Sequence, residues 1–220
     1  MRADFQLYVI TDRKLIRDGN LAGACEAVLK AGSEAAPRGA VAIQLREKDL
    51  DARPLYELAI GLRAVCSRYG APLLINERID VALAADADGV HLPFDSVGAN
   101  QARKLLGPNR LIGASTHSPP DVAGAAREGA DFVVFGPVFD PISKDAATPA
   151  WGPLGLRKAC AAAQIPVFAL GGITPQRIAQ LYESPSAARV PAGVAAIGSI
   201  FQSNDIAAAT TAMLQALMRS

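Results

Sequence analysis

The chain has 220 residues, of which 50% are hydrophobic and 20% are charged, as in an ordinary globular protein. It carries 22 Lys and Arg against 21 Asp and Glu, which argues against a nucleic-acid binder. The charged N-terminus is unlike a signal peptide, and no apolar run is long enough to predict a membrane span. Cys25, Cys66 and Cys160 have no metal-type spacing and indicate buried thiols. We therefore expect a cytoplasmic protein.

Short β-rich runs alternate along the chain with Ala- and Leu-rich stretches of helical length. The strand candidates are continuous apolar runs, which is typical of parallel strands buried on both faces. They cover residues 5–11, 41–46, 72–76, 89–92, 111–115, 132–138, 166–170 and 193–197. The helix candidates cover residues 21–35, 52–69, 80–85, 99–106, 119–128, 153–163, 175–183 and 205–219. Ser118, Thr174 and Asp205 are the capping residues expected at three helix starts.

Eight strand–helix units in a chain of this length predict a (β/α)8 TIM barrel, with residues 1–220 as a single domain. A doubly wound open sheet is the competing architecture, but eight units fit the barrel better. Residues 140–152 follow the sixth strand and are long for a loop, so we expect a lid over the site. Residues 184–192 precede the eighth strand at the opposite end of the barrel and indicate a tolerated insertion.

Glycines follow the last two predicted strands, at the end of a TIM barrel where sites lie. Gly171-Gly172 comes after the seventh strand and Gly198-Ser199 after the eighth. Loops at these places often bind phosphate, because glycine lets the anion approach backbone N–H groups closely. A tight turn is the structural alternative for the glycine pair, and the Gly-Ser at the matching place favours phosphate.

Gln44, Arg46 and Lys48 alternate along the end of the second strand and therefore share one face. Two cations there indicate an anion larger than a monophosphate, in the same cavity as the glycines. The alternative is that these cations form ion pairs with Glu77 or Asp12.

Further polar residues end the third, fourth and fifth strands. Asn76 could hydrogen-bond the larger anion, and Glu77 and Asp95 could hold Mg²⁺ against a diphosphate, although such carboxylates are also common ion-pair partners. His91 lies between apolar neighbours and is expected to be a buried core residue. His117, near Ser115 at the predicted mouth, is either a proton-transfer group or structural.

The ordered motifs LYVITDR, QLREK, LINERIDVALAADADGVHL, IGASTHS, GADFVVFGPVF, PVFALGGITP and GVAAIGSI resemble the thiamine phosphate synthase superfamily, which also contains the thiazole tautomerases. The resemblance runs from about residue 7 to residue 200 and implies a (β/α)8 barrel. The synthases join hydroxymethylpyrimidine diphosphate to a thiazole phosphate and release diphosphate. With the strand-end analysis, the resemblance indicates substrate-binding roles for Gln44, Arg46, Lys48, Asn76, Ser115, Ser143, Lys144, Gly171, Gly172, Gly198 and Ser199, and catalytic roles for Lys48, Lys144 and His117.

The chain departs from the synthase pattern at the family's two Mg²⁺ ligands. Glu77 stands where a synthase usually has Asp, and Ser96, after Asp95, replaces the second Asp. The segment 140–144 reads DPISK where the synthases carry Pro-Thr-x-Thr-Lys. The Leu-Pro-x-x-Ser pattern after the fourth strand is more like the tautomerases, which need neither diphosphate nor Mg²⁺. In those enzymes a histidine matching His117 shifts a proton on a thiazole phosphate carboxylate.

The sequence therefore predicts a thiamine phosphate synthase with altered Mg²⁺ ligands, because Arg46, Lys48 and Lys144 are kept. A thiazole tautomerase that uses His117 is the alternative, and a non-catalytic barrel that binds phosphorylated ligands is the third hypothesis. The expected partners are phosphorylated pyrimidine and thiazole substrates, with assembly into a homo-oligomer left open.

Overall fold

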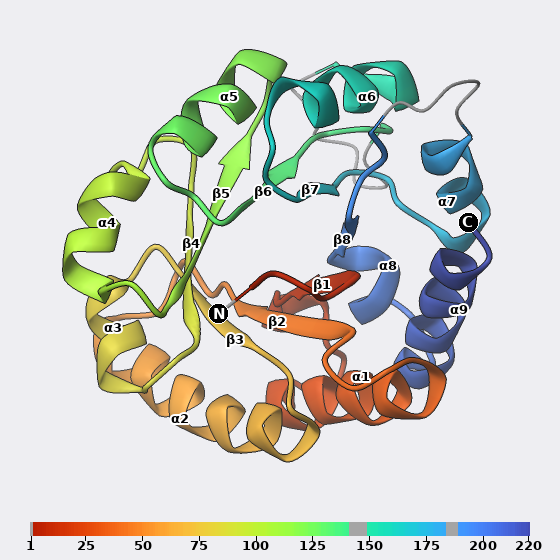
Figure 1. The fold of residues 1–220 in the computed structure, drawn as a ribbon. Coiled ribbons are helices and arrows are strands. Elements are labelled where there is room, and N and C mark those ends of the chain that lie inside the picture. The colour runs from red at the N-terminus through yellow and green to blue at the C-terminus, as the bar shows by residue number, and fades with distance from the viewer. Residues whose placement is uncertain (1, 141–148, 184–188) are drawn as a thin grey trace.

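Eight parallel strands close into a barrel in chain order, with β8 hydrogen-bonded back to β1 (Figure 1). The structure is a computed structural model that describes residues 2–140, 149–183 and 189–220. The strands are β1 (Leu7–Ile10), β2 (Val41–Leu45), β3 (Leu73–Asn76), β4 (Gly89–Leu92), β5 (Leu111–Thr116), β6 (Phe132–Phe135), β7 (Val167–Ala169) and β8 (Gly193–Ala196). The predicted (β/α)8 barrel is thus confirmed.

Helices surround the barrel as an outer ring (Figure 1). They are α1 (Leu21–Ala35), α2 (Ala52–Tyr69), α3 (Ile79–Ala84), α4 (Ala99–Leu106), α5 (Pro119–Arg127), α6 (Gly152–Ala162), α7 (Pro175–Tyr182), α8 (Gly198–Phe201) and α9 (Ile206–Met218), with a 3-10 turn η1 (Arg13–Leu15). The elements η1 and α8 were not predicted, because they are too short to show a helical pattern of apolar residues. It also extended β6 to residue 138, although Pro137 has no N–H to continue the strand pairing.

Side-chain caps fix two of the three helix starts that were expected to carry them. The Ser118 hydroxyl accepts the N–H of Asp121 at 3.3 Å, and the Asp205 carboxylate accepts the N–H of Ala208 at 2.9 Å. Thr174 holds the N-cap position as expected, but its side chain makes no capping bond. At the start of α7 the Pro175 ring, whose φ is already helical, takes the first position.

Aromatic side chains fill the amino end of the barrel. Phe5, just before β1, stacks on Phe168 with ring centroids 4.7 Å apart and meets Phe132 edge-on at 5.3 Å. Tyr8 packs in the same cluster and is fully buried. The polar side chains of the barrel therefore lie at the opposite, carboxyl end, where the site is expected.

The three cysteines are free and buried, as the sequence predicts. Burial raises the pKa of the Cys66 and Cys160 thiols to about 12, which leaves them protonated and unreactive at neutral pH. Within the ranges that the structure describes, no helix combines the length and apolar composition that crossing a membrane requires.

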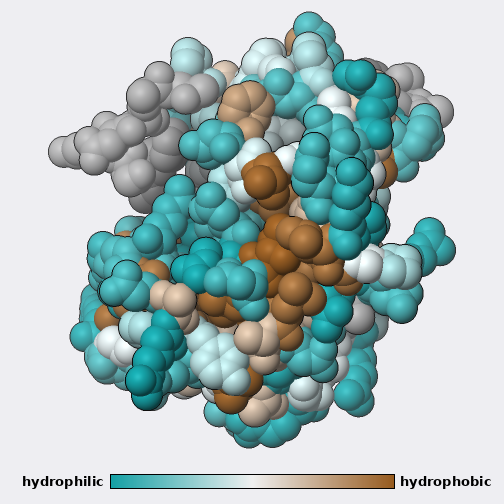
Figure 2. Space-filling model, turned by 90° about the vertical axis from the view of Figure 1, so that its left-hand side faces the viewer, coloured by the Kyte–Doolittle hydropathy of each residue, from teal (hydrophilic) through white to brown (hydrophobic). Residues whose placement is uncertain are grey.

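Apolar side chains gather on the side of the barrel that carries α4 and α5 (Figure 2). Phe94 and Leu105 leave 60% and 64% of their surface exposed, and Val97 is also exposed. These residues lie on α4 and in the loop before it. Exposed apolar patches are typical of interaction surfaces, and assembly into a homo-oligomer stays a prediction.

Candidate functional site

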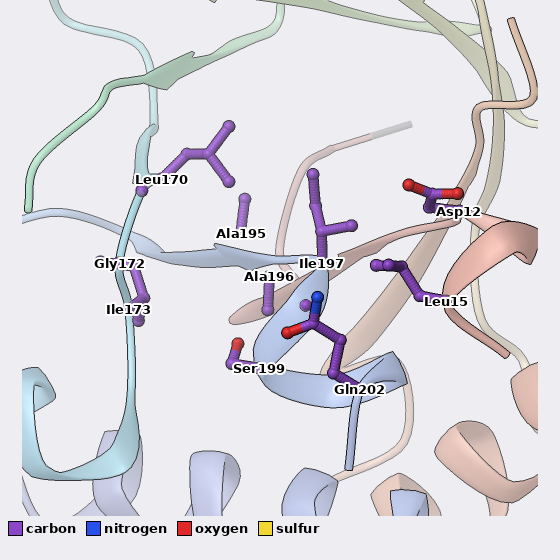
Figure 3. A pocket seen from close by; sticks show the side chains of 12 residues that line it. Asp12, Leu15, Leu170, Gly172, Ile173, Ala195, Ala196, Ile197, Ser199 and Gln202 are labelled. Atoms are coloured by element: carbon purple, nitrogen blue, oxygen red, sulfur yellow. The ribbon is translucent and has the colours of Figure 1, made fainter. Parts of the chain in front are cut away.

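Two neighbouring cavities open at the carboxyl end of the barrel. The glycine cavity, of about 320 Å³, lies at the ends of β7, β8 and β1 and is lined by the residues Gly171, Gly172, Gly198 and Ser199 (Figure 3). The cation cavity, also of about 320 Å³, is lined by Arg46 and Lys48 among others. Leu170 and Ile197 line both cavities, so the two lie side by side. The cations and the glycines, which were expected to face one cavity, thus face adjoining cavities that meet at Leu170 and Ile197.

A turn that requires glycine forms one wall of the glycine cavity. Gly171 and Gly172 have φ values of 102° and 59°, in the left-handed region. A Cβ at Gly172 would lie 2.5 Å from the carbonyl oxygen of Asp140 and 2.8 Å from Nη1 of Arg177. The Arg177 guanidinium donates to the carbonyl of Gly172 at 2.9 Å and lies 5.1 Å from the centre of the Phe139 ring. The turn is therefore closely packed from behind.

The opposite wall of the glycine cavity is the start of α8 (Figure 3). Gly198 and Ser199 lie in its first turn, where backbone N–H groups have no partner within the helix. Among the lining residues, which all belong to the described part of the chain, Asp12 is the sole ionisable one. An anion bound here would therefore rest on N–H groups and the Ser199 hydroxyl rather than on a cation.

The predicted common face of Gln44, Arg46 and Lys48 is present, because all three line the cation cavity. Gln44 is buried, and its Oε1 has no hydrogen-bond partner in the described structure. Its Nε2 makes only a long 3.4 Å contact with Oδ1 of Asn76. Arg46 is half-buried and Lys48 is exposed.

No ion pair within the described ranges involves Arg46 or Lys48. The alternative in which Glu77 or Asp12 neutralises them is therefore wrong. Asp12 instead caps η1, where its carboxylate accepts the N–H of Lys14 at 3.1 Å. Arg46 and Lys48 thus line the cation cavity without an ion-pair partner among the described carboxylates.

His91 is buried, as the sequence predicts, but it also lines the cation cavity. Its Nε2 lies 3.0 Å from the Ser115 hydroxyl, and its Nδ1 has no hydrogen-bond partner among the described residues. A Cβ at Gly113 would lie 2.7 Å from that Nδ1, so glycine makes room for the ring. Burial, together with the nearby charge of Arg46, lowers the pKa of His91 to about 3. The imidazole is therefore neutral at physiological pH.

This pKa gives a testable pH dependence of stability. The folded-state pKa of about 3 lies below the ordinary value of 6.5, so the unfolded chain binds the proton more tightly. The contribution of neutral His91 to the free energy of unfolding is complete above about pH 6.5. It is lost as the pH falls toward 3, by an amount of order 4 kcal/mol. We expect urea unfolding at pH 7, 6, 5 and 4 to show a steeper loss for the wild type than for His91→Gln.

Ser115→Ala is the matched control for this experiment, since it removes the hydroxyl beside His91 but keeps the buried imidazole. It should retain the slope of the wild type. Equal slopes for His91→Gln and the wild type would contradict the prediction.

His117 lies at the edge of the cation cavity with one ring nitrogen engaged. Its Nδ1 lies 2.9 Å from the carbonyl oxygen of Gly136, which can only accept, so Nδ1 carries the proton. The neutral ring then has its lone pair on Nε2. The backbone N–H of His117 donates to Asp121 at 3.0 Å, and the Phe94 ring lies 5.4 Å from the imidazole between centroids. The imidazole is thus held with Nε2 as a proton acceptor.

The two predicted metal ligands do not line one cavity. Asp95 is exposed and is the sole carboxylate among the described residues that line the cation cavity. Glu77 is also exposed and lines neither cavity; its backbone has a left-handed φ of 62°, and its N–H donates to the carbonyl of His91 at 2.8 Å. Ser96 faces a groove between α4 and α5. No group of three or more His, Cys, Asp or Glu side chains placed to hold a metal occurs among the described residues.

Part of the predicted site falls outside the described residues. Ser143 and Lys144 belong to residues 141–148, which make up most of the expected lid. Residues 184–188, in the expected insertion, also lie outside. The roles predicted for Ser143 and Lys144 therefore stay predictions.

The family model described as thiamine monophosphate synthase matches residues 7–210. The chain belongs to this family. A thiamine-phosphate synthase of Caldanaerobacter subterraneus is 39% identical over 220 residues, all of this chain and 96% of that protein. A thiamine-phosphate synthase of Roseiflexus castenholzii is 37% identical over 207 residues, covering 94% of this chain and 86% of the relative.

Solved structures agree with this family. The thiamine phosphate pyrophosphorylase from Pyrococcus furiosus superposes with a TM-score of 0.84 at 32% identity, covering 99% of this chain and 98% of that one. The resemblance drawn from the sequence motifs is therefore confirmed, and so is the barrel that it implied.

Proposed function

We infer that the chain is a thiamine phosphate synthase, a transferase that joins hydroxymethylpyrimidine diphosphate to a thiazole phosphate. Family membership and relatives named thiamine-phosphate synthase support this activity. The structural observation that carries it is the pair of adjoining cavities, which share Leu170 and Ile197. Two anionic substrates bound in neighbouring cavities have their reactive rings at the common boundary.

The reaction needs charge stabilisation rather than proton transfer. The bond between the pyrimidine methylene carbon and the diphosphate oxygen breaks, and the diphosphate leaves with the electron pair. The thiazole nitrogen lone pair then forms the new C–N bond, and this nitrogen becomes a cationic thiazolium. We assign the departing diphosphate to Arg46 and Lys48, and their place in the lining of the cation cavity supports this. Leu170 and Ile197, the apolar residues common to both cavities, would keep water from the carbon that reacts.

The thiazole phosphate is assigned to the glycine cavity. N–H groups at the start of α8 and the close-approach turn at Gly171 and Gly172 suit a phosphate monoester. Gln44 and Asn76, with Ser115 beside them, are assigned to the pyrimidine diphosphate. The unpartnered Oε1 of Gln44 supports this, because a buried amide oxygen favours a ligand that donates a hydrogen bond.

The oxygen atoms present would supply only part of the coordination shell of Mg²⁺. Asp95 and the amide oxygen of Asn76 are hard oxygen donors in the cation cavity, and Glu77 follows Asn76 in the chain. Mg²⁺ often relies on one or two carboxylates, with substrate phosphates and water as the other ligands. The ion would supply further positive charge to the diphosphate. With one carboxylate in the cavity, we expect it to be weakly held.

An assay of purified protein with both substrates tests this function. Thiamine phosphate should form, with only a modest fall in rate when EDTA removes Mg²⁺. The double change Glu77→Asp with Ser96→Asp should raise both the rate and the response to Mg²⁺, because it puts Asp at both positions where a synthase usually carries its Mg²⁺ ligands. Absence of thiamine phosphate in every metal condition would contradict the assignment.

The orientation of His117 favours the thiazole tautomerase as a second candidate, since a free Nε2 at the cavity could move a proton. His117→Ala separates the two. Condensation moves no proton and should fall less than about tenfold, whereas aromatisation of a thiazole phosphate carboxylate would lose about 10²–10⁴ of its rate. Aromatisation that resists EDTA and disappears with His117 would replace the synthase assignment.

A further inference from the structure

A buried hydroxyl joins the ends of β1 and β2 immediately behind Arg46. The pairing of β2 ends at Leu45, and the next N–H, that of Arg46, donates to Oγ1 of Thr11 at 2.9 Å. The same hydroxyl donates its own proton to Oε1 of Glu47 at 2.7 Å. Thr11 is fully buried and Glu47 is 5% exposed. The backbone N–H of Arg46 and the side chain of the next residue, Glu47, are thus bound to one oxygen atom.

Arg13 completes this network from the start of η1. Its backbone N–H donates to both carboxylate oxygens of Glu47, at 3.1 and 3.2 Å, and its Nη1 donates to Oε2 at 3.0 Å. The same guanidinium binds both oxygens of Asp49, at 2.6 and 3.0 Å. These bonds hold the pKa of the Asp49 carboxyl well below its usual range. Arg13 therefore engages both carboxylates, and Asp49 is also bound by Nζ of Lys14 at 2.9 Å.

The segment 46–49 alternates in charge, with cations at 46 and 48 and carboxylates at 47 and 49. Arg46 and Lys48 line the cation cavity, whereas Glu47 and Asp49 bind Arg13. Arg13 lines neither cavity. Without Arg13, Asp49 would keep only Lys14 as an ion-pair partner among the described residues, and Glu47 would have none there. The cations next to Glu47 in the chain are Arg46 and Lys48, and pairing with them would compete with a bound anion.

We propose that Arg13 is a positioning residue that engages Glu47 and Asp49 and so keeps Arg46 and Lys48 directed into the cation cavity and available to an anion. The identity of the anion as a diphosphate leaving group rests on the proposed function. Arg13 touches no substrate in this account and acts only through the two carboxylates.

Binding of inorganic diphosphate tests this role directly. Isothermal titration in EDTA should give a Kd for Arg13→Gln about 10–50-fold above that of the wild type, because Glu47 without its cation and Asp49 with Lys14 alone both oppose the ligand. Arg13→Lys keeps the positive charge but loses the forked guanidinium that binds two carboxylates, so its Kd should lie between those of the wild type and Arg13→Gln. Arg17→Gln removes an exposed cation from the same stretch of chain and should leave the Kd within about twofold.

The decisive variant combines Arg13→Gln with Glu47→Gln and Asp49→Asn. If Arg13 acts by engaging these charges, removing them should bring the Kd back to within about threefold of the wild type. A purely structural network predicts weaker binding as more of it is removed. A triple variant that binds no better than Arg13→Gln overturns the proposal, as does wild-type affinity in Arg13→Gln and Arg13→Lys or a wild type that does not bind diphosphate.

The titration is independent of the condensation assay. A wild type that binds diphosphate with the expected variant order, yet forms no thiamine phosphate, would refute the proposed function and leave the role of Arg13 standing. Normal condensation, together with a diphosphate affinity that does not change when Arg13 is replaced, would refute the role of Arg13 and leave the proposed function standing.

Discussion

Arg46→Met should lower kcat/KM for condensation by about 10²–10³-fold, which is the usual cost of removing one charged donor from a developing anion. Arg46 lines the cation cavity without an ion-pair partner among the described residues, so its full charge is available to the leaving diphosphate. Methionine keeps much of the unbranched side chain, which limits the effect to charge and hydrogen bonding. Steady-state kinetics with each substrate varied in turn measure the loss.

The loss should appear in kcat and in the KM for the pyrimidine diphosphate, with the KM for the thiazole phosphate little changed. Arg127→Met is the matched control, because Arg127 is an exposed residue at the carboxyl end of α5, the end of a barrel helix remote from the mouth. It should condense at the wild-type rate. A tenfold or smaller loss in Arg46→Met would show that the diphosphate charge is held elsewhere.

Regular periodicity explains why most of the barrel could be predicted from sequence. Continuous apolar runs mark the strands because both of their faces are buried, and the alternation of Gln44, Arg46 and Lys48 follows from the period of a strand. Gly171 and Gly172 were found for a similar reason, since residues with a left-handed φ at a strand end are usually glycine.

Tertiary contacts decided what the sequence analysis missed. Leu170 and Ile197 separate the two cavities, but apolar residues at strand ends carry no chemical signal of that role. Arg13 and Glu47 are 34 residues apart and meet only because β1 pairs with β2. Glu77 was assigned to the cavity from its place after a strand, yet its left-handed backbone and exposed side chain leave it out of the lining. Residue type alone indicated none of these placements.

The burial of His91 was predicted, but its place in the lining of the cation cavity was not. Its apolar neighbours indicated a core residue, and burial is what the structure shows. The strand register places His91 opposite Asn76 on β3 and Gly113 on β5, at the level where the cavity begins. A signal was available in the nearness of His91 to the end of β4, since residues at the carboxyl ends of barrel strands contribute to sites.

Gly172→Ala should raise the KM for the thiazole phosphate by about 10²-fold and change the KM for the pyrimidine diphosphate little. The added Cβ would stand 2.5 Å from a backbone carbonyl oxygen, that of Asp140, in a turn whose φ is 59°. A side chain in this conformation is strained, and the clash with backbone must move the turn and its N–H groups away from the phosphate. Inhibition by inorganic phosphate, competitive against the thiazole phosphate, should weaken in parallel.

Gly61→Ala gives this prediction a matched control, since a Cβ there meets nothing within 4 Å and Gly61 lies within α2. It should keep wild-type kinetics and gain a little stability, because alanine suits a helix interior better than glycine. Thermal unfolding of both variants separates a displaced turn from a general loss of fold. If Gly172→Ala raised the KM for the pyrimidine diphosphate instead, the glycine cavity would belong to the other substrate, and the two assignments would exchange.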